Sequence, residues 1–200
     1  MSKIHPAPLV PDALVGIYRI IRKVATTSLR AVYLALDVQG QPVTIAEYLP
    51  VVWLTRATGE QRLHINPENL VLYQRGLQNF FTEGQVLARI SHPSVLRVSD
   101  NFFANETAYR VMNHLEGTSL QDFIITAREL TNIEVFREST IHALFDEILL
   151  GLRLVHQHKL LHLDIKPAHI FITEDNKSVL FGFGAAPEIL GSSDDFSQPK

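Results

Sequence analysis

The residues best suited to chemistry lie in one short segment, His162-Leu163-Asp164-Ile165-Lys166-Pro167. A carboxylate and an ammonium group stand two residues apart there, at Asp164 and Lys166. Pro167 ends any preceding helix and the bulky residues 170–172 begin a strand, so the pair lies in a loop. Such a pair either supplies charge to a reaction or is a solvated ion pair, and the spacing alone favours the second interpretation.

The same segment resembles the catalytic loop of protein kinases, His-Arg-Asp-Leu-Lys-Pro-x-Asn. The resemblance implies that Asp164 accepts the proton of a substrate hydroxyl group and that Lys166 steadies the transferred phosphoryl group. It also implies an α+β, protein kinase-like fold of two lobes. With Asp164 kept and other family residues lost, we expect both charged residues to be vestigial, with Asp164 serving as an acceptor for backbone donors in its own loop.

The composition fits a globular chain that forms one domain or one domain of two lobes. The 200 residues are 46% hydrophobic and 20% charged, and their formal net charge of −3 indicates no nucleic acid and no membrane as a partner. Cysteine is absent, which excludes disulfides and agrees with a cytoplasmic location. No apolar run reaches the ~18 residues of a membrane span, and the first residues lack the apolar core of a signal peptide.

Hydrophobic periodicity predicts an N-lobe made of a five-stranded antiparallel sheet and one helix. The predicted strands are residues 18–23, 31–37, 43–49, 95–103 and 107–113. The pattern is helical from residue 66, and the segment 77–90 places Phe80 and Leu87 on one face together with Glu83. This segment and the His-Pro turn after it resemble helix C of kinases. Glu83 then matches the glutamate that pairs with a lysine of the third strand.

That lysine is missing, because Ala46 stands at its position in the third strand. The neighbouring Glu47 cannot replace it, since successive strand residues point to opposite faces. The glycine-rich turn that covers the nucleotide phosphates in kinases is also changed: Ala25, Thr27 and Arg30 take the places of its three glycines. Cβ atoms keep such a backbone from approaching phosphate as closely as glycine allows.

Residues 109–117 resemble the hinge between the kinase lobes, which makes Met112, Asn113 and Leu115 positions of a nucleotide pocket. Arg30 is a further pocket position. In the with-no-lysine kinases a lysine at this place reaches the phosphates, and Arg30 is a candidate to do the same and to pair with Glu83.

Helical spacing of seven apolar residues predicts a long buried helix that leads to the catalytic loop. They are Ile141, Leu144, Phe145, Ile148, Leu149, Leu152 and Val155. A hairpin of residues 170–173 and 178–181 should follow. Its flanks hold the two metal-ligand positions of the family, which are His169 and Gly182 here. Imidazole is a poor ligand for magnesium and glycine has no side chain, so we expect no metal.

The resemblance covers about residues 16–187, and its helical lobe is incomplete. The expected organisation is a flexible segment at 1–15, an N-lobe at 16–113, a partial C-lobe at 114–190 and a disordered tail at 191–200. The Ala186-Pro187-Glu188 triplet copies the end of a kinase activation segment but follows Gly184 after one residue, so we interpret it as coincidence.

These losses predict a pseudokinase, most similar to bacterial serine/threonine kinases, that acts as a scaffold or allosteric regulator. Its partner would be a protein or a second copy, bound through the incomplete C-lobe, where Leu150 and Leu154 should lack cover. No cofactor is expected. Two alternatives stay open: a weak serine/threonine kinase that uses ATP, Mg²⁺, Asp164 and Arg30, and a metal-independent nucleotide sensor.

Overall fold

The computed structural model describes residues 6–130 and 137–183. These residues form two compact units. The N-terminal unit comprises the described residues of Met1–Ala88 and Val98–His114. The C-terminal unit comprises those of Arg89–Arg97 and Leu115–Lys200. No helix in the described ranges is both long and apolar enough to cross a membrane.

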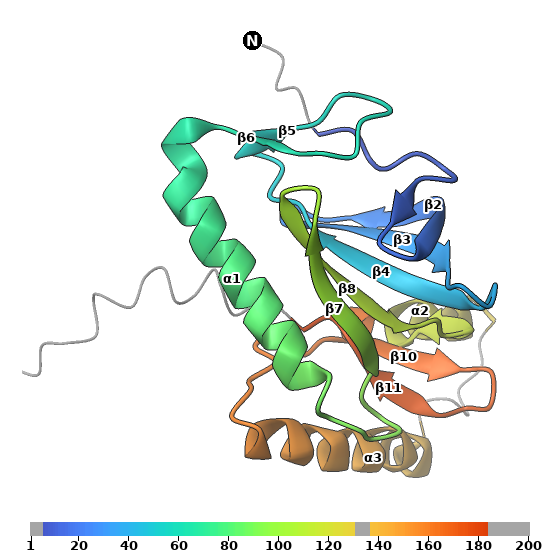
Figure 1. The fold of residues 1–200 in the computed structure, drawn as a ribbon. Helices are drawn as coiled ribbons and strands as arrows, with labels where there is room; N and C mark the ends of the chain where they lie inside the picture. The colour runs from blue at the N-terminus through green and yellow to red at the C-terminus, as the bar shows by residue number, and fades with distance from the viewer. Residues whose placement is uncertain (1–5, 131–136, 184–200) are drawn as a thin grey trace, which may run out of the picture. The chain divides into compact units, whose positions relative to one another are not determined.

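The N-terminal unit is built on an antiparallel sheet with the strand order β1-β2-β3-β4-β8-β7 (Figure 1). Its strands are β1 (Leu14–Val15), β2 (Tyr18–Thr26), β3 (Arg30–Leu36), β4 (Pro42–Tyr48), β7 (Val98–Ala104) and β8 (Thr107–Asn113). The five predicted strands are confirmed, and the two-residue β1 is added at one edge. Between β4 and the helix of this unit lies a small hairpin of β5 (Leu54–Thr55) and β6 (His64–Ile65), which the sequence pattern did not predict.

One helix, α1 (Leu70–Leu87), packs against β7 and β8 and follows a 3₁₀ turn at Pro67–Asn69. Figure 1 shows it in green beside these two strands. Its buried side chains include Tyr73, Phe80 and Glu83, which recur at helical spacing and form its inward stripe. The ring of Tyr48 on β4 lies 5.5 Å from that of Tyr73 and 5.7 Å from that of Phe80. The face of β4 that carries Tyr48 therefore points toward α1.

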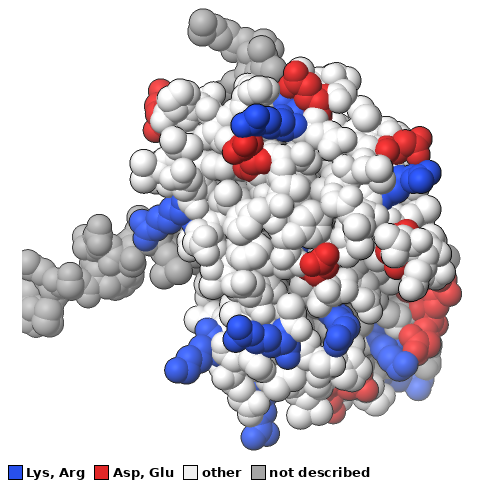
Figure 2. Space-filling view, in the orientation of Figure 1, with Lys and Arg blue, Asp and Glu red and all other residues white. Residues whose placement is uncertain are grey.

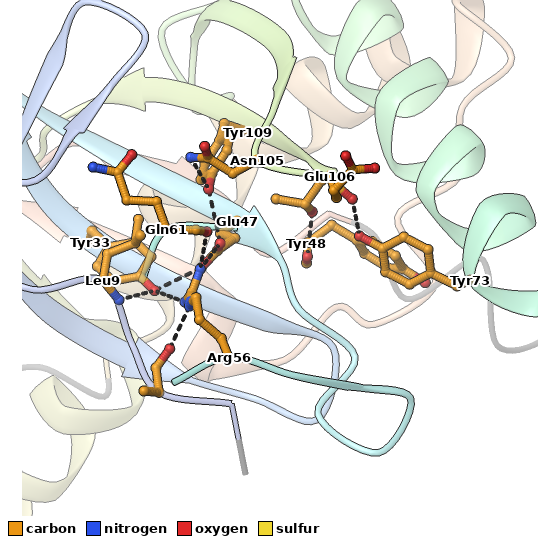
Figure 3. Close-up of polar contacts among 12 residues, drawn as sticks. Leu9, Tyr33, Glu47, Tyr48, Arg56, Gln61, Tyr73, Asn105, Glu106 and Tyr109 are labelled. Carbon is orange, nitrogen blue, oxygen red and sulfur yellow. Dashed lines mark hydrogen bonds and ion pairs between the residues drawn. The ribbon is translucent and has the colours of Figure 1, made fainter. Parts of the chain in front are cut away.

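The opposite face of β4 carries a buried polar network (Figure 3). Glu47 is fully buried and accepts hydrogen bonds from Arg56 (2.5 and 3.0 Å), Tyr33 (2.8 Å) and Tyr109 (3.0 Å). Burial alone would lower the pKa of Arg56, but the hydrogen bond and the charge of Glu47 raise it. Both carboxylate oxygens are thus bound, which satisfies the condition under which a buried charge is tolerated.

The described part of the segment that we expected to be flexible, residues 6–15, packs against this network. Leu9 and Val15 are buried. The Leu9 amide donates to the Tyr33 hydroxyl (3.2 Å), and Arg56 Nε donates to the carbonyl of Ala7 (2.7 Å). Long-range hydrogen bonds of this kind carry no local sequence signal, so periodicity could not reveal them.

The C-terminal unit has a three-stranded antiparallel sheet in the order β11-β10-β9 and two helices. Its elements are β9 (Gly117–Ser119), α2 (Leu120–Glu129), α3 (Glu138–Gln157), β10 (Ile170–Thr173) and β11 (Ser178–Leu180), with a 3₁₀ turn at Pro167–His169. The predicted hairpin and long helix are confirmed. The helix α2 and the strand β9 were not predicted.

The inward face of α3 is narrower than the sequence pattern indicated. Ile148, Gly151 and Val155 are buried, whereas Ile141 is 45% and Leu149 is 59% exposed, so their prediction as buried residues was wrong. The reason is a close approach at Gly151, where an added Cβ would lie 2.9 Å from the side chain of Val95. The described part of the unit covers α3 along this one stripe only.

Charged side chains of both signs are interspersed with uncharged ones on the face drawn in Figure 2. On that face the described residues form no continuous band of one charge. This distribution agrees with the small net charge of the chain.

Candidate functional site

The family positions fall into two sets, one in each unit. Arg30, Ala46, Glu83, Met112 and Asn113 lie in the N-terminal unit, and Leu115, Asp164, Lys166, His169 and Gly182 lie in the C-terminal unit.

In the N-terminal unit, Glu83 has a cationic partner that the sequence pattern did not indicate. Ala46 is buried on the face of β4 that points toward α1, and its direct partner on β8 is Arg110. Directly opposed residues of an antiparallel pair share a face. Arg110 Nη2 lies 3.1 Å from Glu83 Oε2, so an arginine of the neighbouring strand binds the helix glutamate.

The pair of Arg110 and Glu83 is enclosed, with side-chain exposures of 3% and 8%. The guanidinium group also donates to the carbonyl of Phe80 (2.8 Å) and lies 4.4 Å from the centre of the Phe80 ring. Glu83 Oε1 and Arg110 Nε have no hydrogen-bond partner among the described residues. This arginine therefore joins α1 to β8 and is too buried to serve a ligand in solution.

The turn between β2 and β3 uses its own backbone donors internally. Thr27 Oγ1 accepts hydrogen bonds from the amides of Leu29 (3.3 Å) and Arg30 (3.1 Å), and the Thr27 amide donates to the carbonyl of Arg30 (2.8 Å). Amides that are already bound are not available to an anion. The amides of Thr27, Leu29 and Arg30 are thus withdrawn from any phosphate cradle.

Arg30 begins β3 opposite Tyr48, and its guanidinium carbon lies 5.7 Å from the centre of the Phe80 ring. The same ring contacts Arg110, so Phe80 interacts with both cations. Arg110 binds Oε2 of Glu83. The sequence analysis had considered Arg30 as a candidate to pair with this glutamate.

The hinge positions are unremarkable in their polar contacts. Met112 is half-buried on β8, where it is paired with Thr44 and Val98, and Asn113 is exposed at the end of the strand. Leu115 is half-buried in the C-terminal unit. These three residues supply surface rather than charge.

In the C-terminal unit, Asp164 and Lys166 pair with each other. Lys166 Nζ donates to Asp164 Oδ2 over 2.7 Å, and the carboxylate is 36% exposed. The hydrogen bond from Lys166 is the largest cause that lowers the pKa of Asp164. Asp164 is therefore an accessible, ionised carboxylate at neutral pH.

The loop is supported by two histidines. His162 is buried, lies 2.8 Å from the carbonyl of Phe181 through Nε2, and accepts the amide of Asp164 through Nδ1 (3.3 Å). His169 Nδ1 lies 2.8 Å from the carbonyl of Asp164, to which a protonated Nδ1 donates. Leu163 has a φ of +62°, a left-handed conformation that is strained for a non-glycine residue. The loop is thus held in place by backbone contacts.

His169 and Gly182 occupy the two metal-ligand positions of the family, and they are adjacent in space. A Cβ built on Gly182 would lie 2.6 to 2.8 Å from three atoms of the His169 ring. An aspartate at 182 therefore cannot coexist with the ring as it stands. Neither position offers an oxygen ligand, and no group of three potential ligands occurs in the part of the chain that the structure describes. These residues do not fit a magnesium ion.

Sequence reasoning missed Arg110, and it named Thr27 only as a replacement for glycine, not as an acceptor for the amides of its own turn. A signal existed for Arg110, since it is a charged residue inside a strand whose neighbours Tyr109 and Val111 are both buried. A buried charge requires a counter-charge, and Glu83 was the unpaired candidate.

Comparisons with known proteins support the family. The family model described as a protein kinase domain matches residues 65–198, about two thirds of the chain. The serine/threonine-protein kinase D1044.8 of Caenorhabditis elegans is 36% identical over 110 residues, which are 52% of this chain and 11% of that protein. The serine/threonine-protein kinase Nek11 of Mus musculus is 28% identical over 186 residues, 92% of this chain and 27% of that protein. The chain thus spans between about a tenth and about a quarter of the length of these relatives.

Solved structures of kinase domains resemble the fold of this chain. The apo form of PpkA-294 superposes with a TM-score of 0.79 and 26% identity, covering 94% of this chain and 66% of that chain. The Mycobacterium tuberculosis PknI kinase domain gives a TM-score of 0.67 at 19% identity, covering 90% and 62%, and shows likeness of fold alone. The expected kinase-like fold, an antiparallel sheet with one helix and a partial second lobe, is confirmed. The chain belongs to the protein kinase family.

Proposed function

We propose that this chain is a pseudokinase that binds and regulates a protein partner without transferring phosphoryl groups. The observation that carries the proposal is the contact between His169 and Gly182, where the imidazole ring fills the space next to a glycine that has no side chain. Phosphoryl transfer in this family depends on metal ions that neutralise charge between the phosphates. Neither residue can supply the oxygen that magnesium prefers.

Two features of the N-terminal unit support the same proposal. The hydroxyl of Thr27 binds the amides of its turn, and the cation that binds Glu83 is buried on another strand. Removing one preorganised group aimed at developing charge costs ~10² to 10³ in rate. Loss of a lysine and two metal ligands should then lower the rate by several orders of magnitude, although such losses are seldom additive.

A weak serine/threonine kinase is the second candidate, because Asp164 is ionised, partly exposed and paired with Lys166. This arrangement keeps a carboxylate available to a substrate hydroxyl. A base makes the smallest contribution to the rate, however, since phosphoryl transfer relies on positioning and charge stabilisation more than on a base.

A thermal-shift titration with ATP, with and without Mg²⁺ or Mn²⁺, tests the proposal. A ligand at a hundred times its Kd stabilises the folded state by ~2.7 kcal/mol, which raises Tm by roughly 5 to 10 °C for a chain of this size. We expect no shift for the natural chain under any of these conditions. The variant that combines Ala46→Lys, Arg110→Ala, His169→Asn and Gly182→Asp serves as the positive comparison and should gain a metal-dependent shift.

Two outcomes contradict the proposal. A metal-dependent shift together with phosphorylation of a generic protein substrate, lost in Asp164→Ala but kept in Asp175→Ala, makes the chain a kinase. Asp175 is a matched control because it too pairs with a lysine two residues on, Lys177. A shift with ATP alone, independent of metal, makes the chain a nucleotide sensor.

A further inference from the structure

Residues 6–10 lie on the N-terminal unit in the way that a bound peptide lies on a protein, and we call them the docked segment. They belong to no helix or strand. The Ala7 amide donates to the carbonyl of Arg56 (3.0 Å), and Arg56 Nε donates to the carbonyl of Ala7 (2.7 Å). The Leu9 amide donates to the Tyr33 hydroxyl (3.2 Å). The segment is thus held through its main chain at alternate residues, as docked extended peptides are.

One side chain anchors the docked segment. Leu9 is 3% exposed and belongs to the core cluster that also contains Leu54 and Leu63. Pro6 is buried as well, whereas Pro8 between them is exposed. The segment therefore has a defined inward side. The buried leucine supplies the apolar part of the contact, and the main-chain hydrogen bonds fix its register.

The groups that hold the docked segment are fixed by a network of their own (Figure 3). Glu47 accepts hydrogen bonds from the Tyr33 hydroxyl (2.8 Å) and from the Arg56 guanidinium group (2.5 and 3.0 Å). Tyr33 and Glu47 stand on the neighbouring strands β3 and β4, whose register is unbroken. A site whose polar groups are already ordered loses little conformational entropy when a peptide binds.

The sequence of the docked segment, Pro6-Ala7-Pro8-Leu9-Val10, suits a peptide ligand. Proline fixes φ near −65° and has no amide hydrogen, so it favours an extended chain and removes a donor that would need a partner. Only two of the residues 6–9 carry an amide hydrogen, Ala7 and Leu9, and these are the two amides that the protein binds. The pattern of prolines therefore matches the pattern of acceptors.

The docked segment is held less firmly than the strands beside it. Its hydrogen bonds to Arg56 and Tyr33 are isolated, whereas β3 and β4 share a continuous ladder. A turn closed by the Ala13 amide and the Val10 carbonyl (3.2 Å) separates the segment from β1. A short segment with few hydrogen bonds beside a turn opens at a lower free energy than the sheet does.

We propose that the groove under residues 6–10 is a peptide-binding site, which accepts an extended Pro-x-Pro-Leu peptide of a partner protein in place of the docked segment. The partner's leucine takes the position of Leu9, and its amides bind the Arg56 carbonyl and the Tyr33 hydroxyl. The docked segment competes with the partner, because a tethered segment has an effective concentration in the millimolar range. The groove lies on the face of β4 opposite to Ala46, so the inference holds whether or not the chain transfers phosphoryl groups.

Fluorescence anisotropy with a labelled, N-acetylated peptide of residues 6–12 tests the proposal. The receptor is the full chain with Leu9→Ser, which removes the anchor of its own segment. This variant should bind the peptide saturably, and the natural chain should bind it about tenfold more weakly or worse, since its own segment competes. A peptide that itself carries Leu9→Ser should not bind.

Two tyrosine variants, made in the Leu9→Ser chain, locate the bound peptide. Tyr33→Phe removes the hydroxyl that accepts the amide of the anchoring leucine and should weaken peptide binding by about threefold to tenfold. Tyr109→Phe is the matched control, because Tyr109 also donates to Glu47 (3.0 Å) but is not the hydroxyl that the segment binds. It should leave peptide binding unchanged.

Hydrogen exchange tests the detachment of the segment in the natural chain, without any substitution. The amides of Ala7 and Leu9 should exchange about a hundredfold faster than those of β4, because the segment opens while the sheet stays intact.

The proposal is wrong if a folded Leu9→Ser chain does not bind the peptide or binds it no better than the natural chain. It is also wrong if Tyr33→Phe and Tyr109→Phe have equal effects, or if the Ala7 and Leu9 amides exchange only together with β4. A Leu9→Ser chain that stays unfolded with saturating peptide would make residues 6–10 an integral part of the fold. A dimer of the natural chain that Leu9→Ser abolishes would make a second copy, and not a partner protein, the source of the peptide.

Discussion

Arg110 on β8 lies directly opposite Ala46 on β4, and its guanidinium group binds Glu83 of α1. The cation that the family carries on the third strand is thus replaced by one from the adjacent strand. The substitution preserves a link between helix and sheet while the charge is buried. We expect this link to contribute to stability rather than to ligand binding.

Arg110→Ala should lower the free energy of unfolding by about 3 to 5 kcal/mol, because it leaves the buried Glu83 carboxylate without its counter-charge. Chemical denaturation monitored by circular dichroism measures this loss. Ala46→Lys introduced together with Arg110→Ala should recover part of it, since an ammonium group from the opposed residue shares the same face. Arg75→Ala removes an exposed arginine of α1, the helix that carries Glu83, and should change the free energy of unfolding by less than ~0.5 kcal/mol. An Arg110→Ala variant as stable as the natural chain would refute this role.

Gly182→Ala should destabilise the chain by about 1 to 3 kcal/mol, because the new Cβ would contact the His169 ring and because Gly182 has a φ of +84°. The two causes can be separated. Gly40 has a φ of +76° with no neighbouring atom within 4 Å, so Gly40→Ala reports the backbone cost alone. His169→Ala should reduce the remaining cost of Gly182→Ala. Equal losses for both glycine variants would mean that the ring contact has no energetic weight.

The Asp164 carboxyl group should titrate below its ordinary pKa, because it accepts a hydrogen bond from Lys166 and then feels the charges of its neighbours. A depressed pKa stabilises the fold above the ordinary pKa of aspartate, and this effect is lost as the pH falls through the lower value. At an exposed site the contribution is small and screened by salt. Carbon-detected NMR measures the midpoint, which Lys166→Met should raise. Lys177→Met is the control and should leave the midpoint of Asp164 unchanged.

The fold should be lost in alkali as its tyrosines ionise. Burial raises the pKa of all five tyrosines of the chain. The pKa of Tyr18 and of Tyr48 rises to about 12, and those of Tyr33, Tyr73 and Tyr109 also rise. An unfolded tyrosine ionises near pH ~10, so this stabilisation is complete below that pH and is lost as the pH rises through the folded values. Tyrosinate absorbance should therefore appear together with unfolding. Ionisation near pH ~10 in an intact fold would contradict the burial.

Most of the fold could be predicted from the sequence because its larger elements carry long periodic patterns. The strands β2, β3, β4 and β8 and the helix α3 span seven or more residues each, which is enough for alternation or a helical stripe to be visible. The strands β1, β5 and β6 have two residues each and carry no period. The helix α2 did have a signal: Ser119 accepts the Asp122 amide at its start, and Ser-x-x-Asp is a capping pattern.

The site was predictable only where a residue type is informative by itself. The motifs alone show that Gly182 has no side chain at a metal-ligand position and that Ala46 replaces a lysine. A charged residue inside a predicted strand is only a partial signal for the partner of Glu83, because the register that places Arg110 opposite Ala46 spans 64 positions of sequence. The contact of His169 with Gly182 likewise depends on how the loop folds back on the end of the hairpin.

The position of Arg110 also has a consequence for the order of assembly. A lysine at position 46 would precede α1 in the chain, whereas Arg110 is made after it, so a growing chain completes α1 before its buried counter-charge exists. Until β8 joins the sheet, Glu83 remains in water and the helix has no polar anchor. We therefore expect α1 to gain protection from hydrogen exchange late, together with β8, when refolding is followed by pulse labelling.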